Sequence, residues 1–170
     1  MPKELCCKYS KMIEDKLISS NLYKEADTLL IYASYRSEVS TYGIIKQAFK
    51  DSKKVFCPKV LSPGIMEFYE IHSLDEIICG YKNIPEPPST NLSFEQHKSY
   101  NTLMAMPLVA YDSAKTRIGY GGGFYDRYLQ THTVTHTIAL GFECQRYESA
   151  IPYEDTDIKP EFILTETNYF

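Results

Sequence analysis

The sequence predicts an α/β fold, built as a single-domain three-layer α/β/α sandwich around a mostly parallel sheet. Short apolar runs that suit buried strands alternate along the chain with amphipathic stretches that suit helices. The length of 170 residues fits one domain with a full hydrophobic core. Hydrophobic residues make up 44% of the chain and charged residues 24%, which is the balance of a soluble globular protein.

The composition excludes several other classes of protein. No apolar run approaches the ~20 residues of a membrane span, and the first residues lack a signal-peptide layout, so we expect a cytoplasmic protein that binds no membrane. A net charge of −4 argues against non-specific binding of nucleic acid. The cysteines are odd in number and form no C-x-x-C pair, which favours reduced thiols: Cys6, Cys7, Cys57, Cys79 and Cys144.

The first half of the chain predicts two rounds of helix and strand. Residues 3–20 have the apolar spacing of an amphipathic helix, and residues 28–34 form the apolar run of a buried parallel strand. A Ser-Thr pair at residues 40–41 can cap the helix that follows. Residues 54–58 predict a second strand, and residues 67–71 alternate as an edge or hairpin strand does.

In the second half we expect a short helical turn at residues 74–78, a proline-stiffened loop at 81–88 and a polar connection without a motif at 89–100. A buried strand at 102–110, the first turns of a helix at 124–129 and another strand at 135–141 follow. His132 and His136 lie four residues apart, but the alternation around them indicates a strand, so we expect no helical metal pair there.

The most informative stretch is residues 117–126, whose centre we call the glycine loop (residues 119–123). It holds half of the chain's eight glycines, and Arg117 and Asp126 flank it. A strand, a glycine-rich loop and a helix N-terminus form the arrangement in which backbone N–H groups hold phosphate. A plain structural turn is the alternative. Neither the dinucleotide fingerprint nor the Walker pattern fits these residues.

Two further residues are candidates for the same site. Glu38 follows the predicted strand at residues 28–34, at the end of the strand where ligands bind in open α/β sheets. A solvated loop glutamate is the alternative. Lys59 follows the predicted strand at residues 54–58 and is a candidate cation facing the site, or else an exposed loop lysine.

Several segments resemble one enzyme family, in the correct order. Residues 106–129 resemble its signature P-x-x-A-F-D-x-x-G-x-R-L-G-Y-G-G-G-Y-Y-D-R-x-L, and shorter matches to its S-E-V/I-D-T, K-x-V-x-x-P-K-V and closing L-P-x-x-x-x-D segments fall at residues 37–45, 54–60 and 151–166. On these motifs the chain resembles the 5-formyltetrahydrofolate cyclo-ligase (5,10-methenyltetrahydrofolate synthetase) family. The resemblance implies a fold similar to the sugar-phosphate isomerase and CoA-transferase group.

The resemblance implies a reaction that consumes ATP and needs Mg²⁺. It closes 5-formyltetrahydrofolate to 5,10-methenyltetrahydrofolate through an N5-iminium phosphate, in an enzyme that we expect to be monomeric and to bind only small molecules. The roles that it implies are catalysis by Arg117 and Asp126, ATP binding by Arg117, Ile118, Gly119, Tyr120, Gly121, Gly122, Gly123, Phe124 and Tyr125, substrate binding by Glu38, Lys59, Tyr120 and Phe124, and Mg²⁺ binding by Asp126 and Asp157. Ordinary helix packing is the alternative for the three aromatic residues, and Asp112 is expected to shape a turn.

Departures from the family pattern limit this transfer. Lys115 stands at a turn glycine, Phe124 replaces a tyrosine, and Glu161 replaces an aspartate. The family's basic N-terminal helix has no counterpart in the best alignment, so we expect either that the chain starts internally or that it holds ATP with fewer cations. In both cases we expect weak ATP binding and slow turnover. Two other functions stay open: a folate- or nucleotide-binding protein with weak or lost catalysis, and an isomerase or CoA transferase that needs no ATP.

Overall fold

A computed structural model describes residues 1–94 and 101–170. Part of the predicted polar connection, residues 95–100, lies outside the described residues. The first part of that connection, residues 89–94, is paired with strand β3. Ser93 forms a bridge to Tyr69, and the buried Phe94 donates its backbone N–H to the Phe68 carbonyl at 2.7 Å.

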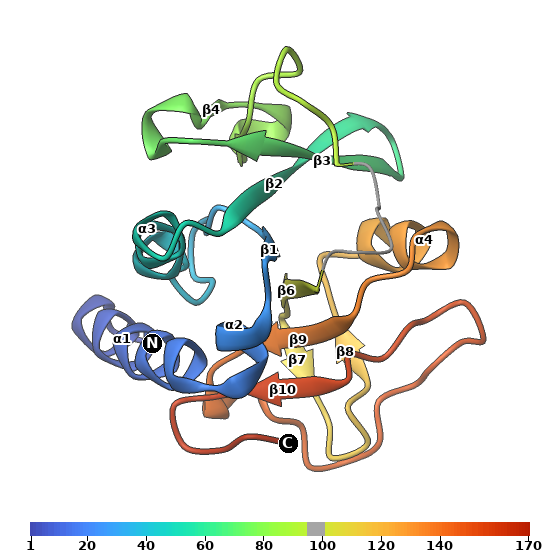
Figure 1. The fold of residues 1–170 in the computed structure, drawn as a ribbon. Helices are drawn as coiled ribbons and strands as arrows, with labels where there is room; N and C mark the ends of the chain where they lie inside the picture. Colours follow the sequence, from blue (N-terminus) through green and yellow to red (C-terminus); the bar gives the residue numbers. More distant parts are fainter. Residues whose placement is uncertain (95–100) are drawn as a thin grey trace.

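A mostly parallel sheet forms the middle layer, as predicted (Figure 1). Among the described residues it has six strands in the order β10-β9-β6-β1-β2-β3, and only β3 is antiparallel to its neighbour. In chain order the strands are β1 (Thr28–Ile31), β2 (Lys54–Ser62), β3 (Ile65–Ile71), β6 (Thr102–Pro107), β9 (His136–Leu140) and β10 (Phe162–Leu164).

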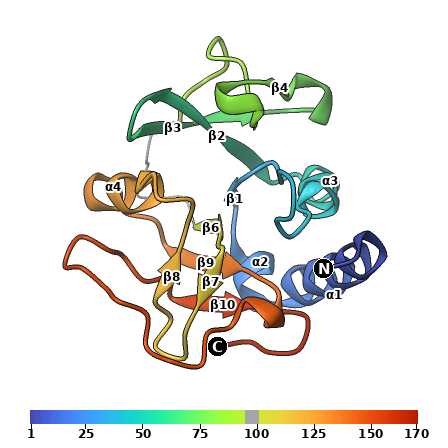
Figure 2. The same cartoon turned by 180° about the vertical axis from the view of Figure 1, so that it is seen from behind.

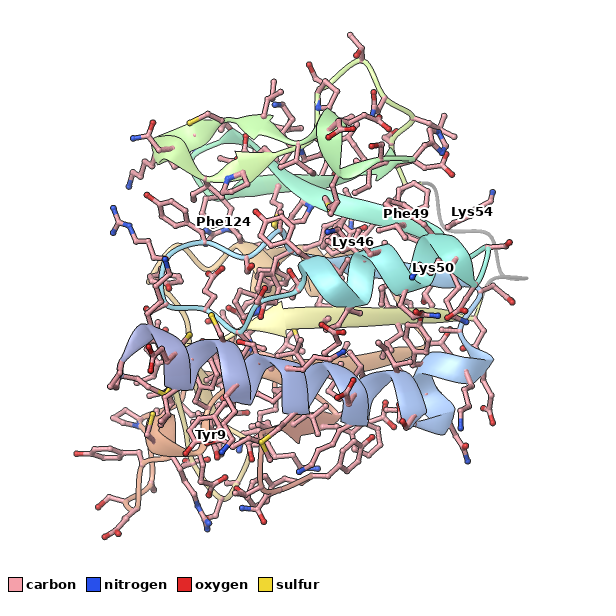
Figure 3. The ribbon with its side chains drawn as sticks, turned by 90° about the vertical axis from the view of Figure 1, so that its left-hand side faces the viewer. Tyr9, Lys46, Phe49, Lys50, Lys54 and Phe124 are labelled. Carbon is pink, nitrogen blue, oxygen red and sulfur yellow. The ribbon has the colours of Figure 1, made fainter. Side chains whose placement is uncertain are left out.

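Helices cover both faces of the sheet, which makes the three layers (Figures 1 and 2). One face carries α1 (Lys3–Ser19), α2 (Asn21–Glu25) and α3 (Tyr42–Lys50), and α1 and α3 lie side by side in Figure 3. The opposite face carries α4 (Phe124–Thr131). None of the helices in the described part of the chain is both long and apolar enough to cross a membrane.

The smaller elements are η1 (Leu74–Glu76), β4 (Ile78–Cys79), η2 (Tyr81–Asn83), β5 (Pro85–Glu86), β7 (Ala110–Tyr111), β8 (Arg117–Ile118) and η3 (Glu143–Gln145). Strands β4 and β5 form one antiparallel pair, and β7 and β8 form another.

Strand β1 shows how the sequence divides the core. All its residues are buried, and successive side chains point to opposite faces. Leu29 and Ile31 therefore join α1 and α3 in one hydrophobic cluster, which receives Ile13 and Leu17 from the buried stripe of α1. Leu30 joins a second cluster under α4. A strand buried on both faces is mostly apolar, and residues 29–31 of β1 are all Leu or Ile, with the buried Thr28 as the polar exception.

Three local predictions were wrong in detail. The first strand ends at Ile31, and β2 continues through Pro58 to Ser62, so Lys59 lies inside a strand and not on a loop. Thr41 is the N-cap residue of α3, but its hydroxyl does not cap the helix. It donates to the Tyr32 carbonyl at 2.6 Å and accepts from the Ser34 N–H at 3.1 Å, and so it ties the helix start to the end of β1.

The strand that directly precedes the glycine loop also differs from the prediction. Strand β6 ends at Pro107, and the β7–β8 hairpin lies between it and the loop. Asp112 shapes this hairpin, as expected. Its buried carboxylate accepts backbone N–H groups of Ala114, Thr116 and Ile151, each at 2.9 Å. Although burial acts to raise the pKa of Asp112, these backbone hydrogen bonds hold it below the usual range.

We expect Asp112→Asn to destabilise the fold by about 1–3 kcal/mol. The substitution replaces one carboxylate oxygen with an NH2 group, which cannot accept a hydrogen bond from a buried backbone N–H. Urea unfolding monitored by circular dichroism measures the change. Asp15→Asn is the matched control, since Asp15 is exposed and makes only a surface ion pair with Lys11. Equal losses in the two variants would show that the three hydrogen bonds contribute little.

Candidate active site

The topology brings two connections to one edge of the sheet. Strands β1 and β6 are parallel neighbours, but the chain leaves β1 through α3 to reach β2 on one side, and leaves β6 through α4 to reach β9 on the other. This is a topological switch point, the place where open α/β sheets bind ligands. Glu38 lies on the first connection, and the glycine loop lies on the second.

The glycine loop has an open outer half and a packed inner half. A Cβ at Gly119 or Gly121 would meet no atom within 4 Å, and Tyr120 between them is 64% exposed. A Cβ at Gly122 would strike the Phe124 ring at 2.5 Å. Gly123 is the N-cap of α4 with a φ of 59°, a conformation that glycine adopts without strain, and it offers no side chain to the N–H groups of the first turn.

Arg117 and Asp126 meet across the loop. The Arg117 Nη2 donates to the Asp126 Oδ1 at 2.8 Å, with the two side chains only 6% and 16% exposed. The same carboxylate oxygen accepts the Ile158 backbone N–H at 3.1 Å. In the described part of the chain the buried Arg117 Nε has no hydrogen-bond partner. A buried guanidinium N–H without a partner is costly, so this atom is suited to an incoming anion.

The two aspartates predicted to bind Mg²⁺ are connected through one backbone hydrogen bond. Asp157 precedes Ile158, whose N–H binds Asp126, so the two aspartates belong to adjoining backbone. Asp157 also accepts the Glu154 N–H at 2.9 Å. The described residues contain no cluster of three His, Cys, Asp or Glu side chains able to hold a metal. This donor set fits Mg²⁺, which takes one or two carboxylates and completes its shell with phosphate oxygens and water.

Glu38 faces a group of tyrosines that includes two from the glycine-loop connection. Burial raises the pKa of Tyr32, Tyr42, Tyr120 and Tyr125, and the charge of Glu38 adds to each of these shifts. Burial also raises the pKa of Glu38 itself to about 7, against the opposing effect of a hydrogen bond from the Tyr35 N–H at 2.7 Å. Glu38 and Tyr120, both predicted to bind substrate, are therefore near enough for the charge of one to act on the other, and their role in binding stays a prediction.

The aromatic side chains after the loop differ in exposure. Phe124 and Tyr125 pack against the core cluster under α4, and the Tyr125 ring meets Phe68 edge-on at 6.4 Å. The packing alternative therefore describes these two residues, whereas the exposed Tyr120 is free to stack on a ligand.

Two candidate cations have protein partners. Lys59 donates to the Pro87 carbonyl at 3.1 Å and lies 3.7 Å from the buried Glu86 carboxylate. Lys115 adopts the left-handed turn conformation expected of the family's glycine, with a φ of 61°, and donates to the Glu161 carbonyl at 2.8 Å. Neither amine is held within the glycine loop, which leaves Arg117 as the predicted cation closest to it.

One charged residue of this edge was missed by the sequence analysis. Arg36 has a φ of 53° and lies exposed beside Tyr35, with the guanidinium 4.8 Å from the ring centroid. Its charge lowers the pKa of Tyr120, against the larger effect of burial, so it faces the glycine loop. Arg36 lies two residues before Glu38 in the sequence, and this closeness could have identified it as a candidate.

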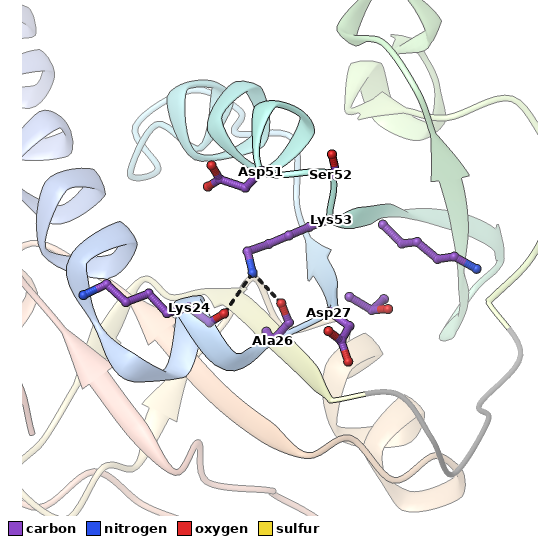
Figure 4. A pocket seen from close by; sticks show the side chains of 8 residues that line it. Lys24, Ala26, Asp27, Asp51, Ser52 and Lys53 are labelled. Atoms are coloured by element: carbon purple, nitrogen blue, oxygen red, sulfur yellow. Dashed lines mark hydrogen bonds between the residues drawn. The ribbon is translucent and has the colours of Figure 1, made fainter.

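The other candidates do not belong to the site. All five cysteines are free thiols. His132 stacks on Tyr128 at 4.1 Å, and His136 pairs with Glu161 at 2.7 Å, so the two histidines have separate partners. A polar cavity of about 400 Å³ lies at the opposite edge of the sheet, where β1 and β2 begin (Figure 4), and Lys53 closes one side of it by donating to the Ala26 and Lys24 carbonyls.

The fold and the site define an α/β protein with a glycine loop and a buried arginine–aspartate pair at a switch point. A model of the 5-formyltetrahydrofolate cyclo-ligase family matches residues 1–166, so the chain belongs to this family. The cyclo-ligase of Escherichia coli (strain K12) is 31% identical over 144 residues, which are 82% of this chain and 78% of that protein. The cyclo-ligase of Mus musculus is 29% identical over 167 residues, 92% of this chain and 82% of that protein.

Solved structures agree on the fold. The NMR structure of 5,10-methenyltetrahydrofolate synthetase from Aquifex aeolicus matches with a TM-score of 0.84 and 24% identity, over 99% of this chain and 84% of that one. The synthetase from Mycoplasma pneumoniae matches with a TM-score of 0.76 and 18% identity, over 98% of this chain and 90% of that one. The expected likeness to the sugar-phosphate isomerase and CoA-transferase group stays a prediction.

We expect Glu38→Gln to stabilise the fold at alkaline pH. The folded protein keeps a proton on Glu38 up to about pH 7, whereas the unfolded chain releases it near the ordinary pKa of 4.5. The free energy of unfolding therefore falls between these two pH values and stays lowered above them. Neutral glutamine removes that loss, so the variant should be about 1–3 kcal/mol more stable at pH 8 and little different at pH 4. Urea titrations at both pH values test this, and equal stability at pH 8 would show that Glu38 is well solvated.

Proposed function

We propose that this chain catalyses the ATP-dependent closure of 5-formyltetrahydrofolate to 5,10-methenyltetrahydrofolate, with release of ADP and phosphate. Membership of the cyclo-ligase family supports this reaction. The observation that carries it is the meeting of two features at one switch point: a glycine loop before an uncapped helix, and a half-buried glutamate on the neighbouring connection. The first suits a nucleotide phosphate, and the second suits a polar heterocycle.

The reaction requires activation of a poor leaving group. The formyl oxygen on N5 attacks the γ-phosphorus of ATP, and ADP leaves, which gives an N5-iminium phosphate. N10 then attacks the formyl carbon and gives up its proton, and phosphate leaves as the five-membered ring forms. Phosphoryl transfer depends chiefly on aligning the two reactants and on neutralising the charge that moves between them.

We assign the nucleotide end to the glycine loop. Backbone N–H groups of the loop and of the first turn of α4 donate to the phosphate oxygens. The buried Arg117 Nε, which lacks a described partner, donates to the same phosphate. Asp126 orients Arg117 through their hydrogen bond. Asp126 and Asp157 would hold Mg²⁺, which neutralises phosphate charge when it is bound. Tyr120 is available for stacking on a ring.

We assign the folate end to Glu38. A half-buried carboxylate near several tyrosines is suited to accept hydrogen bonds from the amine groups of a pterin ring. A pKa of about 7 also lets the same group accept the proton that N10 releases. We propose Lys59 as a supporting residue, which keeps this side of the site in place through Glu86. We further propose that the chain acts as a monomer in the cytoplasm.

The decisive experiment mixes the protein with 5-formyltetrahydrofolate and Mg-ATP and follows the absorbance of the methenyl product. A rise that requires ATP supports the proposed reaction. No rise, with both ligands bound in calorimetry, would favour a binding protein that has lost catalysis. Turnover of sugar phosphates or CoA esters without ATP would favour the isomerase or transferase alternative.

We expect Asp126→Asn to lower kcat about 10²- to 10³-fold, because the substitution releases Arg117 and weakens the metal site together. Initial rates across a Mg²⁺ titration measure both effects. Asp155→Asn is the matched control, since Asp155 is exposed in the same segment as Asp157. Near-normal turnover of the Asp126 variant at limiting Mg²⁺ would place the metal elsewhere.

We expect Glu38→Gln to weaken binding of 5-formyltetrahydrofolate by roughly 1.5–3 kcal/mol, about 10- to 150-fold, and to leave ATP affinity unchanged. Separate calorimetric titrations with each ligand test this assignment. A fall in ATP affinity with folate affinity intact would reverse the two ends of the site.

A further inference from the structure

We propose that Arg127 is a positioning residue, whose guanidinium ties the glycine loop to the β2–β3 turn and so holds the loop in place for phosphoryl transfer. This inference rests on the proposed function. Arg127 follows Asp126 on α4, but its side chain is exposed and is directed away from the Arg117–Asp126 pair, toward two backbone carbonyls.

The two hydrogen bonds of Arg127 connect segments that are distant in the sequence. Its Nε donates to the Gly64 carbonyl at 2.8 Å, and its Nη2 donates to the Gly122 carbonyl. Gly64 lies in the turn that joins β2 to β3, and Gly122 lies in the inner half of the glycine loop. A planar guanidinium fixes the angle between its donors, so the bridge sets the orientation of one segment relative to the other as well as their separation.

Glycines on both sides make room for this bridge. A Cβ at Gly64 would lie 2.6 Å from the Arg127 Nη2, and a Cβ at Gly123 would lie 2.9 Å from its Nη1. Gly64 also has a φ of +79°, which suits the third position of a tight turn after Pro63. The guanidinium therefore lies between two backbone segments at distances that only glycine permits.

The bridge contacts the inner half of the glycine loop, at Gly122 and Gly123. The outer half, at Gly119 and Gly121, has no neighbour within Cβ reach, so its position depends on the inner half. Near-attack geometry is sensitive to small displacements, and a shift of about 1 Å can cost about 100-fold in rate. Loss of the bridge should therefore impair the alignment of the ATP phosphates more than the binding of either substrate.

The fold does not depend on Arg127. Helix α4 packs on the sheet through Tyr128, which is buried and meets the Phe68 ring at 5.0 Å. Since Arg127 is exposed, its replacement leaves no cavity and no buried charge. A variant of this residue should fold normally, and a purely structural role would show in stability before it showed in rate.

The experiment compares Arg127→Met and Arg127→Lys with the unchanged protein in the Mg-ATP and 5-formyltetrahydrofolate assay. We expect Arg127→Met to lower kcat about 10- to 100-fold. Its Tm should stay within a few degrees of that of the unchanged protein. Its separate affinities for Mg-ATP and for 5-formyltetrahydrofolate should stay within about twofold. Lysine keeps the charge but not the fork, so Arg127→Lys should recover only part of the rate. Arg146→Met, at an exposed arginine paired with Glu143, is the control.

A double-mutant cycle with Gly64→Ala tests the bridge itself. Alanine at a φ of +79° strains the turn in both backgrounds, but only in the unchanged background does its methyl group also displace the guanidinium. The fall in kcat should therefore be severalfold in the unchanged background and clearly smaller in the Arg127→Met background. Normal kcat in Arg127→Met, full recovery by lysine, or a rate loss that only follows the fall in Tm would each overturn the inference. Absence of turnover in the unchanged protein would instead count against the proposed function.

Discussion

The parallel pairing of β1 with β6 is the constraint on which the site depends. The two strands run side by side in register from Thr28 and Thr102, yet the connections that follow them diverge to opposite faces of the sheet. Each connection must begin at the carboxyl edge, because it has to run back along the sheet before the next parallel strand starts. Residues that the sequence separates widely, Glu38 and the glycine loop, are brought to one edge for this reason.

Strong hydrophobic periodicity and motifs made much of the fold predictable from the sequence. The buried strands, the helices and the pairing of the glycine loop with a helix N-terminus follow from local patterns. The β7–β8 hairpin could not be foreseen, because strands as short as Ala110–Tyr111 carry no period. Strand β2 was expected to stop at Pro58, because proline has no backbone N–H to donate to a neighbouring strand. The pairing of β2 with β1 ends at Phe56, however, so Pro58 lies where β1 needs no N–H from it and the strand can continue.

The polar partners of the site were the least predictable part. The sequence predicts Asp126 to be a metal ligand. In the structure its Oδ1 also accepts hydrogen bonds from Arg117 and from the Ile158 N–H. Lys59 and Lys115 are cations by composition, but tertiary contacts direct them to Glu86 and to the Glu161 carbonyl. Such pairings depend on side chains that meet only after the sheet forms, so no local pattern records them. Arg36 shows the converse case, a charged residue that acquires a position at the site through a left-handed backbone turn.

The division of the glycine loop into two halves separates two kinds of evolutionary pressure. The fold has its own reasons to retain Gly122 and Gly123, because a side chain there would strike Phe124 or Arg127. It has no steric reason to retain Gly119, which has open space around it and lies outside the left-handed region. Drift at Gly119 is therefore limited by what the site must accommodate, and drift at Gly122 and Gly123 is limited by folding as well. Substitutions tolerated at Gly119 would consequently report how closely a ligand approaches the backbone, independently of stability.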